Sequence, residues 1–137
     1  MKRTKAFILS LALLGACLPV QAVPVGSFSR DELGQCPGTD KSVRKELKFG
    51  RGRATTIVRD RIALCTSHDY YLRARRGQRM KVHLVAGRKT SFTVYAPTDR
   101  LSDGTWDWSG ELPETGEYQI SIGTDVTARY TLKVTIR

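Results

Sequence analysis

Apolar and polar residues alternate along most of the chain, and the alternation is clearest at its C-terminal end. Between residues 129 and 137, every second side chain is a large hydrophobic one. An alternation with period two gives a β-strand one buried face and one wet face. Three segments of this kind predict the core of the fold, namely Tyr130, Leu132, Val134 and Ile136, then Met80, Val82 and Leu84, and then Tyr118, Ile120 and Ile122.

Turn-forming residues separate the alternating segments at intervals of about 8 to 12 positions. Arg76-Gly77-Gln78 and Pro113-Glu114-Thr115-Gly116 are examples, since glycine permits a positive φ and proline presets a turn angle. We therefore expect an all-β fold, a single antiparallel two-sheet β-sandwich of about seven to eight strands with jelly-roll or Greek-key connections, and a closed barrel is the alternative. The strands are predicted over residues 46–49, 54–64 with a break near Asp60, 68–75, 79–86, 91–96, 105–112, 117–123 and 129–137.

Residues 1–22 have the organisation of a bacterial export signal. A basic start with Lys2, Arg3 and Lys5 precedes an apolar run over residues 7–14, which is too short to span a bilayer. We expect cleavage after Ala22, so that the mature protein is periplasmic or secreted and has no transmembrane segment.

The same residues allow a second way of processing the chain. Leu14-Gly15-Ala16-Cys17 resembles a lipobox, in which Cys17 would become the lipidated first residue of an outer-membrane lipoprotein. After the signal is removed, residues 23–45 contain Gly26, Gly34, Pro37 and Gly38 and predict an irregular N-terminal arm. Residues 46–137 then form the one sandwich domain.

Two cysteines remain after the signal is removed. Cys36 and Cys65 are left as a pair in an oxidising compartment, which predicts a disulfide between them. Closing a loop of this length would stabilise the fold by about 3 to 4 kcal/mol.

Charge is distributed unevenly over a chain whose formal net charge is +10. Residues 41–89 hold 15 Lys and Arg against three acids, whereas residues 99–125 hold seven acids and only Arg100. A basic surface favours an anionic partner, and in an exported protein this is an envelope glycan, a membrane or an acidic protein cleft rather than nucleic acid. The candidate basic patch is Arg51, Arg53, Arg73, Arg75 and Arg79.

No constellation for catalysis is recognisable, so we expect a binding protein that is not an enzyme and needs no cofactor. His68 and His83 are the two histidines and are interpreted as surface residues, although a metal site of Cys65 with His68 is an alternative. Oxygen ligands from Asp99, Asp103 and Asp107 could hold calcium, but they match no complete EF-hand loop, and we assign no metal.

Two tryptophans stand two positions apart, at Trp106 and Trp108. Residues at this spacing share one face of a strand. We interpret them as core residues, and a sugar-stacking platform is the alternative.

Several short motifs occur in a fixed order in the second half of the chain. Residues 70–78 read Tyr-Tyr-Leu-Arg-Ala-Arg-Arg-Gly-Gln, residues 92–94 read Phe-Thr-Val, and residues 110–118 read Gly-Glu-Leu-Pro-Glu-Thr-Gly-Glu-Tyr. With the final alternating strand, this set resembles the bacterial pre-peptidase C-terminal-like β-sandwich domains and the related periplasmic inhibitors of g-type lysozyme. The resemblance covers about two thirds of the chain and marks the scaffold more than the site.

The resemblance implies a surface that blocks a lysozyme active-site cleft. Its target-binding residues would be Thr115, Gly116 and Tyr118 in one turn and Arg129 in the loop before the last strand. Asp125 stands where the family's first loop arginine is expected, and this reverses the charge at that position. We expect the turn at 115–117 and the loop at 124–129 to project from one end of the sandwich.

Two functions therefore follow from the sequence. The first is an exported, non-catalytic inhibitor of g-type lysozyme that blocks the acidic active-site cleft. The alternative is an envelope carbohydrate- or polyanion-binding module that uses the basic patch, with an anionic glycan as its partner.

Overall fold

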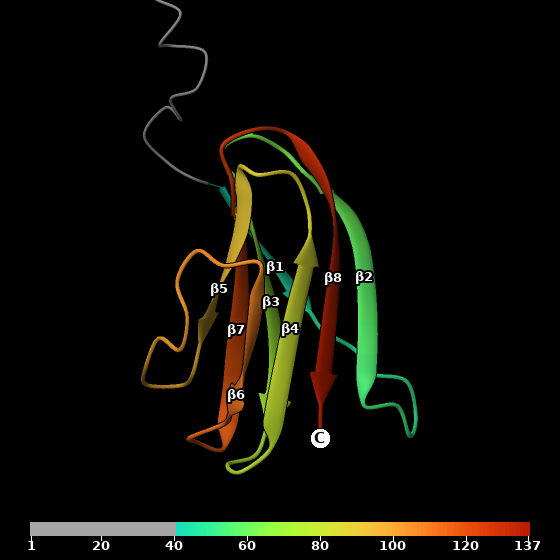
Figure 1. The fold of residues 1–137 in the computed structure, drawn as a ribbon, viewed down its shortest axis with the longest axis vertical. Helices are drawn as coiled ribbons and strands as arrows, with labels where there is room; N and C mark the ends of the chain where they lie inside the picture. Colours follow the sequence, from blue (N-terminus) through green and yellow to red (C-terminus); the bar gives the residue numbers. More distant parts are fainter. Residues whose placement is uncertain (1–40) are drawn as a thin grey trace, which may run out of the picture.

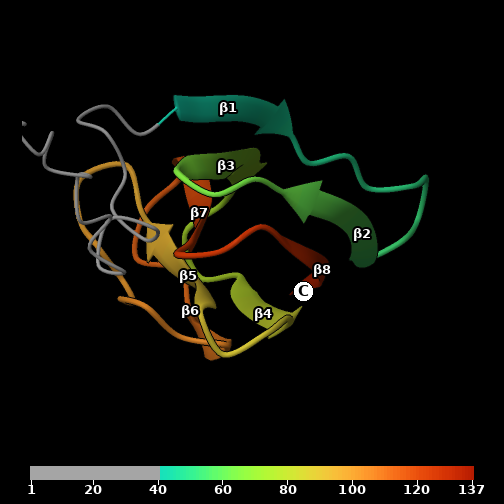
Figure 2. The same ribbon diagram turned by 90° about the horizontal axis from the view of Figure 1, so that it is seen from above.

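The computed structural model describes residues 41–137, which form eight β-strands and no helix. The strands make two four-stranded sheets that pack face to face (Figure 1). Seen from above, the order β1-β3-β7-β5 forms one layer and β2-β8-β4-β6 forms the other (Figure 2). The strands are β1 (Lys41–Glu46), β2 (Thr55–Ile62), β3 (Thr66–Ala74), β4 (Arg79–Val85), β5 (Thr90–Tyr95), β6 (Asp107–Glu111), β7 (Gly116–Thr124) and β8 (Ala128–Ile136).

The core lies between the two sheets and consists of the inward-facing residues of the alternating strands. All three predicted sets are found there, and only Ile136, at the end of β8, is half-buried rather than buried. Phe92 and Val94 of β5 are buried in the same core. The β-sandwich prediction is therefore confirmed, and Gly77 has a φ of 86° in the turn before β4, as the turn chemistry requires.

The beginning of the sandwich differs from the prediction. Residues 41–46 form strand β1, where we expected an irregular arm, and residues 47–49 are not a strand. β1 pairs in parallel with β3, so the first sheet is not wholly antiparallel. The strand escaped detection because it lies at a sheet edge with most of its side chains exposed, so no buried alternation marks it.

The predicted break near Asp60 is also absent, because β2 runs without interruption from Thr55 to Ile62. A charged residue at this position is accommodated by a partner from β1, since the Asp60 carboxylate forms an ion pair with Lys45. The signal segment, Cys17, Cys36 and the arm up to residue 40 lie outside the described residues. Among residues 41–137, no helix has the length and apolar character needed to cross a membrane.

Candidate functional site

The two segments predicted to bind a target lie at opposite ends of the sandwich. The turn with Thr115 and Gly116 leads into β7, and the loop before β8 follows the end of the same strand. β7 has nine residues, which separates its ends by about 27 Å. In Figure 1 the turn is at the lower end and the loop at the upper end. The prediction that both project from one end is wrong, because strand topology rather than motif order decides where a loop emerges.

The turn before β7 is held by Tyr118, whose side chain is fully buried. Its hydroxyl donates to the carbonyl of Glu114 at 2.6 Å and accepts from the amide of the same residue at 3.1 Å. Tyr118 therefore positions the turn and cannot contact a target, which corrects its predicted role. Thr115 accepts a hydrogen bond from the Arg76 amide at 3.0 Å, and a Cβ on Gly116 would come within 2.8 Å of the Pro97 ring.

The loop between β7 and β8 is tied to its neighbours at both ends. The Asp125 amide donates to the Lys89 carbonyl at 3.0 Å, and the Thr127 hydroxyl accepts from the Leu64 amide at 3.1 Å. Asp125, Val126 and Thr127 are nevertheless exposed. These hydrogen bonds fix the backbone of the loop while its side chains stay exposed. Binding residues are commonly found on loops that a rigid β scaffold holds in this way.

Arg129 lies at the start of β8 and faces Arg61 directly across the ladder with β2. Arg59 stands two positions further along the same face of β2. All three are exposed and line a hollow of about 580 Å³, whose opposite wall is formed by Val85, Ala86 and Gly87. We call Arg59, Arg61 and Arg129 the arginine cluster.

The arginine cluster is poised for an anion. None of its three guanidinium groups forms an ion pair with an acid of residues 41–137. Like charges placed opposite each other on neighbouring strands destabilise a sheet, and a carboxylate placed between them would relieve that repulsion with bidentate hydrogen bonds. The sequence analysis singled out Arg129 but not Arg59 or Arg61, because the pairing of β2 with β8 cannot be predicted from either segment alone.

All members of the predicted basic patch are exposed, but they do not share one face. Arg51 and Arg53 lie in the loop between β1 and β2, and Arg75 lies in the turn after β3. Both connections are at the lower end in Figure 1. Arg79 begins β4 in one sheet, whereas Arg73 belongs to β3 in the other.

His68 is buried, which corrects its interpretation as a surface residue. Its Nδ1 lies 2.7 Å from the Tyr130 hydroxyl, which lies 2.5 Å from the Tyr70 hydroxyl, so a polar chain joins β3 to β8. Burial lowers the pKa of His68 and raises the pKa of Tyr130. All three side chains are buried, and their hydrogen bonds link the two sheets.

Neither predicted alternative for a metal is supported within residues 41–137, where no group of three His, Cys, Asp or Glu could hold an ion. Asp103 lies 3.5 Å from Arg100, and Asp107 contacts His83, which is half-exposed on β4. The three loop acids therefore do not converge.

The tryptophans are divided between core and surface. Trp108 packs against the core. Trp106 is 45% exposed, and its indole nitrogen donates to the Thr90 carbonyl at 2.7 Å. The two rings are therefore not exposed side by side, as a sugar-stacking platform would require.

Comparison with known proteins finds relatives by fold only. The sequence matches no protein-family model, and no curated protein is recognisably similar to it. Among solved structures, PliG of Aeromonas hydrophila, a periplasmic inhibitor of g-type lysozyme, superposes with a TM-score of 0.67 at 24% identity, over 72% of this chain and all of that one.

Two further inhibitors of the same description are similar. PliG of Salmonella Typhimurium gives a TM-score of 0.56 at 21% identity, over 72% of this chain and all of that one. A mutant of PliG from Escherichia coli gives 0.56 at 18% identity, over 71% of this chain and 99% of that one. The chain therefore has the fold of the PliG periplasmic lysozyme inhibitors.

Proposed function

We propose that this protein is an exported, non-catalytic inhibitor of g-type lysozyme that acts in the periplasm. The observation that carries the proposal is the extent of the fold match, which spans the whole of the Aeromonas inhibitor rather than a shared substructure. Fold alone does not specify function, so the second support is the arginine cluster on the same sandwich, whose guanidinium groups form no ion pair with an acid of residues 41–137.

Inhibition requires only that the arginine cluster occupies a cleft lined by acids. Glycoside hydrolases generally use a pair of carboxyl groups, and a guanidinium group binds a carboxylate through two parallel hydrogen bonds. Arg129 enters the cleft first because it borders the exposed loop of residues 125–127, and Arg61 beside it supplies a second guanidinium. Binding energy then comes from charge-assisted hydrogen bonds that become buried on contact.

Asp125 acts against this attraction. It is exposed in the loop that precedes Arg129, and an acid that approaches catalytic carboxylates repels them. Its backbone amide is hydrogen-bonded to the β4–β5 turn. This bond does not depend on the side chain, so another residue at position 125 could form it as well. The protein is therefore a weaker inhibitor than one with a basic residue at this position.

The surface that we assign to the lysozyme does not include the turn before β7, which lies at the opposite end of the sandwich. Thr115 and Gly116 are about 27 Å from the loop and are occupied in holding the turn onto its neighbours. We assign them a structural role, together with Tyr118.

A binding panel tests the proposal. The purified protein without its export signal is titrated by calorimetry into g-, c- and i-type lysozymes and incubated with isolated peptidoglycan sacculi. We expect saturable one-to-one binding to g-type lysozyme, weakened by Arg129→Ala and unaffected by Arg73→Ala. Arg73 provides a matched loss of one exposed charge on the other sheet. Binding to sacculi without binding to any lysozyme would overturn the inhibitor proposal.

A further inference from the structure

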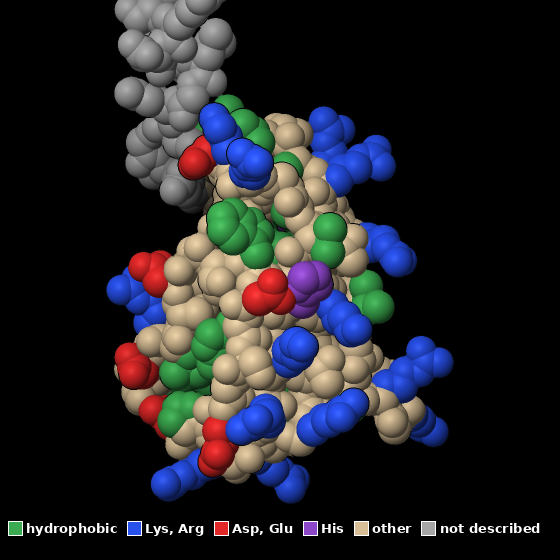
Figure 3. Space-filling model, viewed as in Figure 1, with side chains coloured by type: hydrophobic (Ala, Val, Ile, Leu, Met, Phe, Trp, Pro, Cys, Tyr) green, Lys and Arg blue, Asp and Glu red, His purple; other side chains and the backbone are tan. Residues whose placement is uncertain are grey.

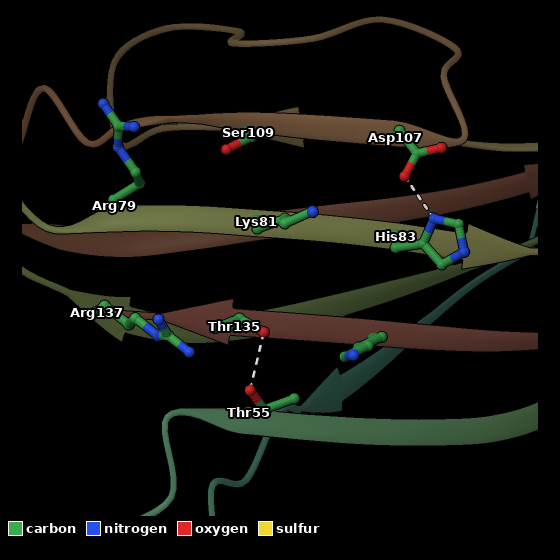
Figure 4. A pocket seen from close by; sticks show the side chains of 9 residues that line it. Thr55, Arg79, Lys81, His83, Asp107, Ser109, Thr135 and Arg137 are labelled. Atoms are coloured by element: carbon green, nitrogen blue, oxygen red, sulfur yellow. Dashed lines mark hydrogen bonds and ion pairs between the residues drawn. The ribbon is translucent and has the colours of Figure 1, made fainter.

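The outer face of the β2-β8-β4-β6 sheet carries a second group of cations, which the arginine cluster does not include. Lys81 on β4 stands opposite Ser109 on β6 and opposite Thr135 on β8, and Thr135 bonds Thr55 of β2 at 2.9 Å. These four residues form a row across the sheet, with one ammonium group among three hydroxyls. Figure 4 shows them rising from the same side of their strands.

Further cations lie on both sides of this row. Lys133 is two residues before Thr135 on β8, about 7 Å away, and it stands opposite His83. In the other direction Arg79 and Arg137 face each other through two backbone hydrogen bonds of 2.8 and 3.0 Å. Figure 3 shows blue side chains gathered on this face below the histidine. We call Arg79, Lys81, Lys133 and Arg137 the sheet-face cluster.

The sheet-face cluster is not neutralised by the described part of the chain. None of its members forms an ion pair with an acid of residues 41–137. Two acids stand on the adjoining edge strand β6, where Asp107 contacts His83 and Glu111 faces Arg79 across the ladder. The positive charge is therefore concentrated over β4 and β8, and it is partly offset by the two acids on β6.

The lining of the surface indicates what kind of anion it suits. The cations surround a shallow hollow of about 690 Å³, and no Trp, Tyr or Phe is among the described residues that line it. Protein interfaces depend on large aromatic or apolar anchors at their centre, and both neutral sugars and single-stranded nucleic acid depend on stacking. Here hydroxyl groups lie between cations that are spaced about 7 Å or more apart along the strands. This arrangement instead suits a polymer that repeats hydroxyl and acidic groups.

We propose that the sheet-face cluster binds a linear anionic polysaccharide laid across β4 and β8, independently of lysozyme. The acidic groups of successive sugars pair with Lys81, Lys133 and the Arg79–Arg137 pair, and the hydroxyls of Thr55, Ser109 and Thr135 bond the sugar rings. Because the ligand crosses several cations at once, its affinity comes from many weak contacts and falls steeply with salt.

Polygalacturonate, a carboxylate-bearing linear polysaccharide, is the test probe. The protein without its export signal is titrated with the polymer at low and moderate ionic strength, and with dextran and monomeric galacturonate as controls. We expect binding to the polymer alone, and roughly tenfold weaker binding for the double variant Lys81→Gln/Lys133→Gln, because two exposed ion pairs with the polymer are lost. The charge-matched control is Arg73→Gln/Arg88→Gln, whose residues are exposed and lie outside the cluster, and it should bind nearly as wild type does.

Three outcomes would overturn this proposal. They are the absence of polymer binding by the wild type, equal losses in the two double variants, and binding of phosphatidylglycerol vesicles in preference to the polymer, which would assign the face to a membrane. The result is separable from the proposed inhibition. Lys81→Gln/Lys133→Gln should weaken lysozyme binding far less than Arg129→Ala does, and Arg129→Ala should weaken polymer binding far less than Lys81→Gln/Lys133→Gln does.

Discussion

His68, Tyr130 and Tyr70 form a polar chain that joins β3 to β8. Lys45 and Asp60 lie at its outer end, with the Asp60 carboxylate 3.7 Å from the His68 Nδ1. Every buried side-chain polar atom of residues 41–137 has a hydrogen-bond partner, so the chain is satisfied while the imidazole is neutral. Protonation adds a charge to a site where burial and the nearby Lys45 ammonium both oppose it.

This arrangement predicts a loss of stability in mild acid. Because burial lowers the pKa of His68 below its ordinary 6.5, the unfolded chain takes up a proton that the folded chain does not. The stability that depends on neutral His68 is fully present above about pH 6.5 and declines as the pH falls towards the folded-state pKa. Urea unfolding between about pH 7.5 and about pH 5 measures the decline.

A variant separates this residue from the other titrating groups. His68→Gln should reduce the pH slope over that range, and His83→Gln provides the control because it removes the other histidine, which is half-exposed on β4. An unchanged slope in His68→Gln would show that His68 is not the group responsible.

At the scale of the elements, the turn between β6 and β7 is held by a single core side chain. Tyr118 reaches from β7 to bond both the amide and the carbonyl of Glu114. Because its ring is fully buried, the tyrosine fixes the turn to the core.

Removing that hydroxyl should destabilise the sandwich without affecting its binding surface. Tyr118→Phe leaves two backbone groups without their partner and should cost about 1 to 2 kcal/mol in the free energy of unfolding. Lysozyme binding should be retained, because the turn lies at the other end of β7. Tyr95→Phe is the control, since Tyr95 is an exposed tyrosine. If Tyr118→Phe were as stable as the control but failed to bind, the binding role first predicted for this residue would be restored.

The same elements show what the sequence can and cannot predict. β4, β7 and β8 were located from their buried alternation, which is a local property of each strand. β1 was missed because an edge strand with exposed side chains has no such signal. The arginine cluster required the register of Arg61 against Arg129, and the burial of His68 required the packing of β3 against β8. Both are long-range pairings that no single segment encodes.

At the scale of the whole molecule, the N-terminal arm is predicted to be fastened to the sandwich by a disulfide. Cys65 lies between β2 and β3 with a φ of 58°, and Cys36 lies outside the described residues. Thiol labelling of the unfolded, unreduced protein should find no free cysteine after export. Cys36→Ser/Cys65→Ser should lower the free energy of unfolding by about 3 to 4 kcal/mol. Two labelled thiols in the wild type would contradict the pairing.

At the scale of the whole molecule, the two surfaces that we propose bind anions lie on one sheet. The arginine cluster lies at the end where β8 begins, and the sheet-face cluster lies where β8 ends. Arg129 and Arg137 are separated by about 27 Å of strand, but the nearest members of the two clusters, Arg59 and Lys133, are only about 8 Å apart, because Arg59 faces Thr131 and Lys133 stands two residues further along β8. The two clusters share no residue, so substitutions in one can be compared with substitutions in the other.

Inhibition of g-type lysozyme is the measurement that tests the central claim most directly. Lysis of a bacterial suspension by the enzyme is followed with increasing amounts of wild type, Arg129→Ala, Asp125→Arg and the control Arg73→Ala. We predict inhibition by the wild type and the control, a loss of about 2 kcal/mol or more in the binding free energy for Arg129→Ala, and a gain for Asp125→Arg. Lysis at the same undiminished rate with the wild type and every variant would contradict the account.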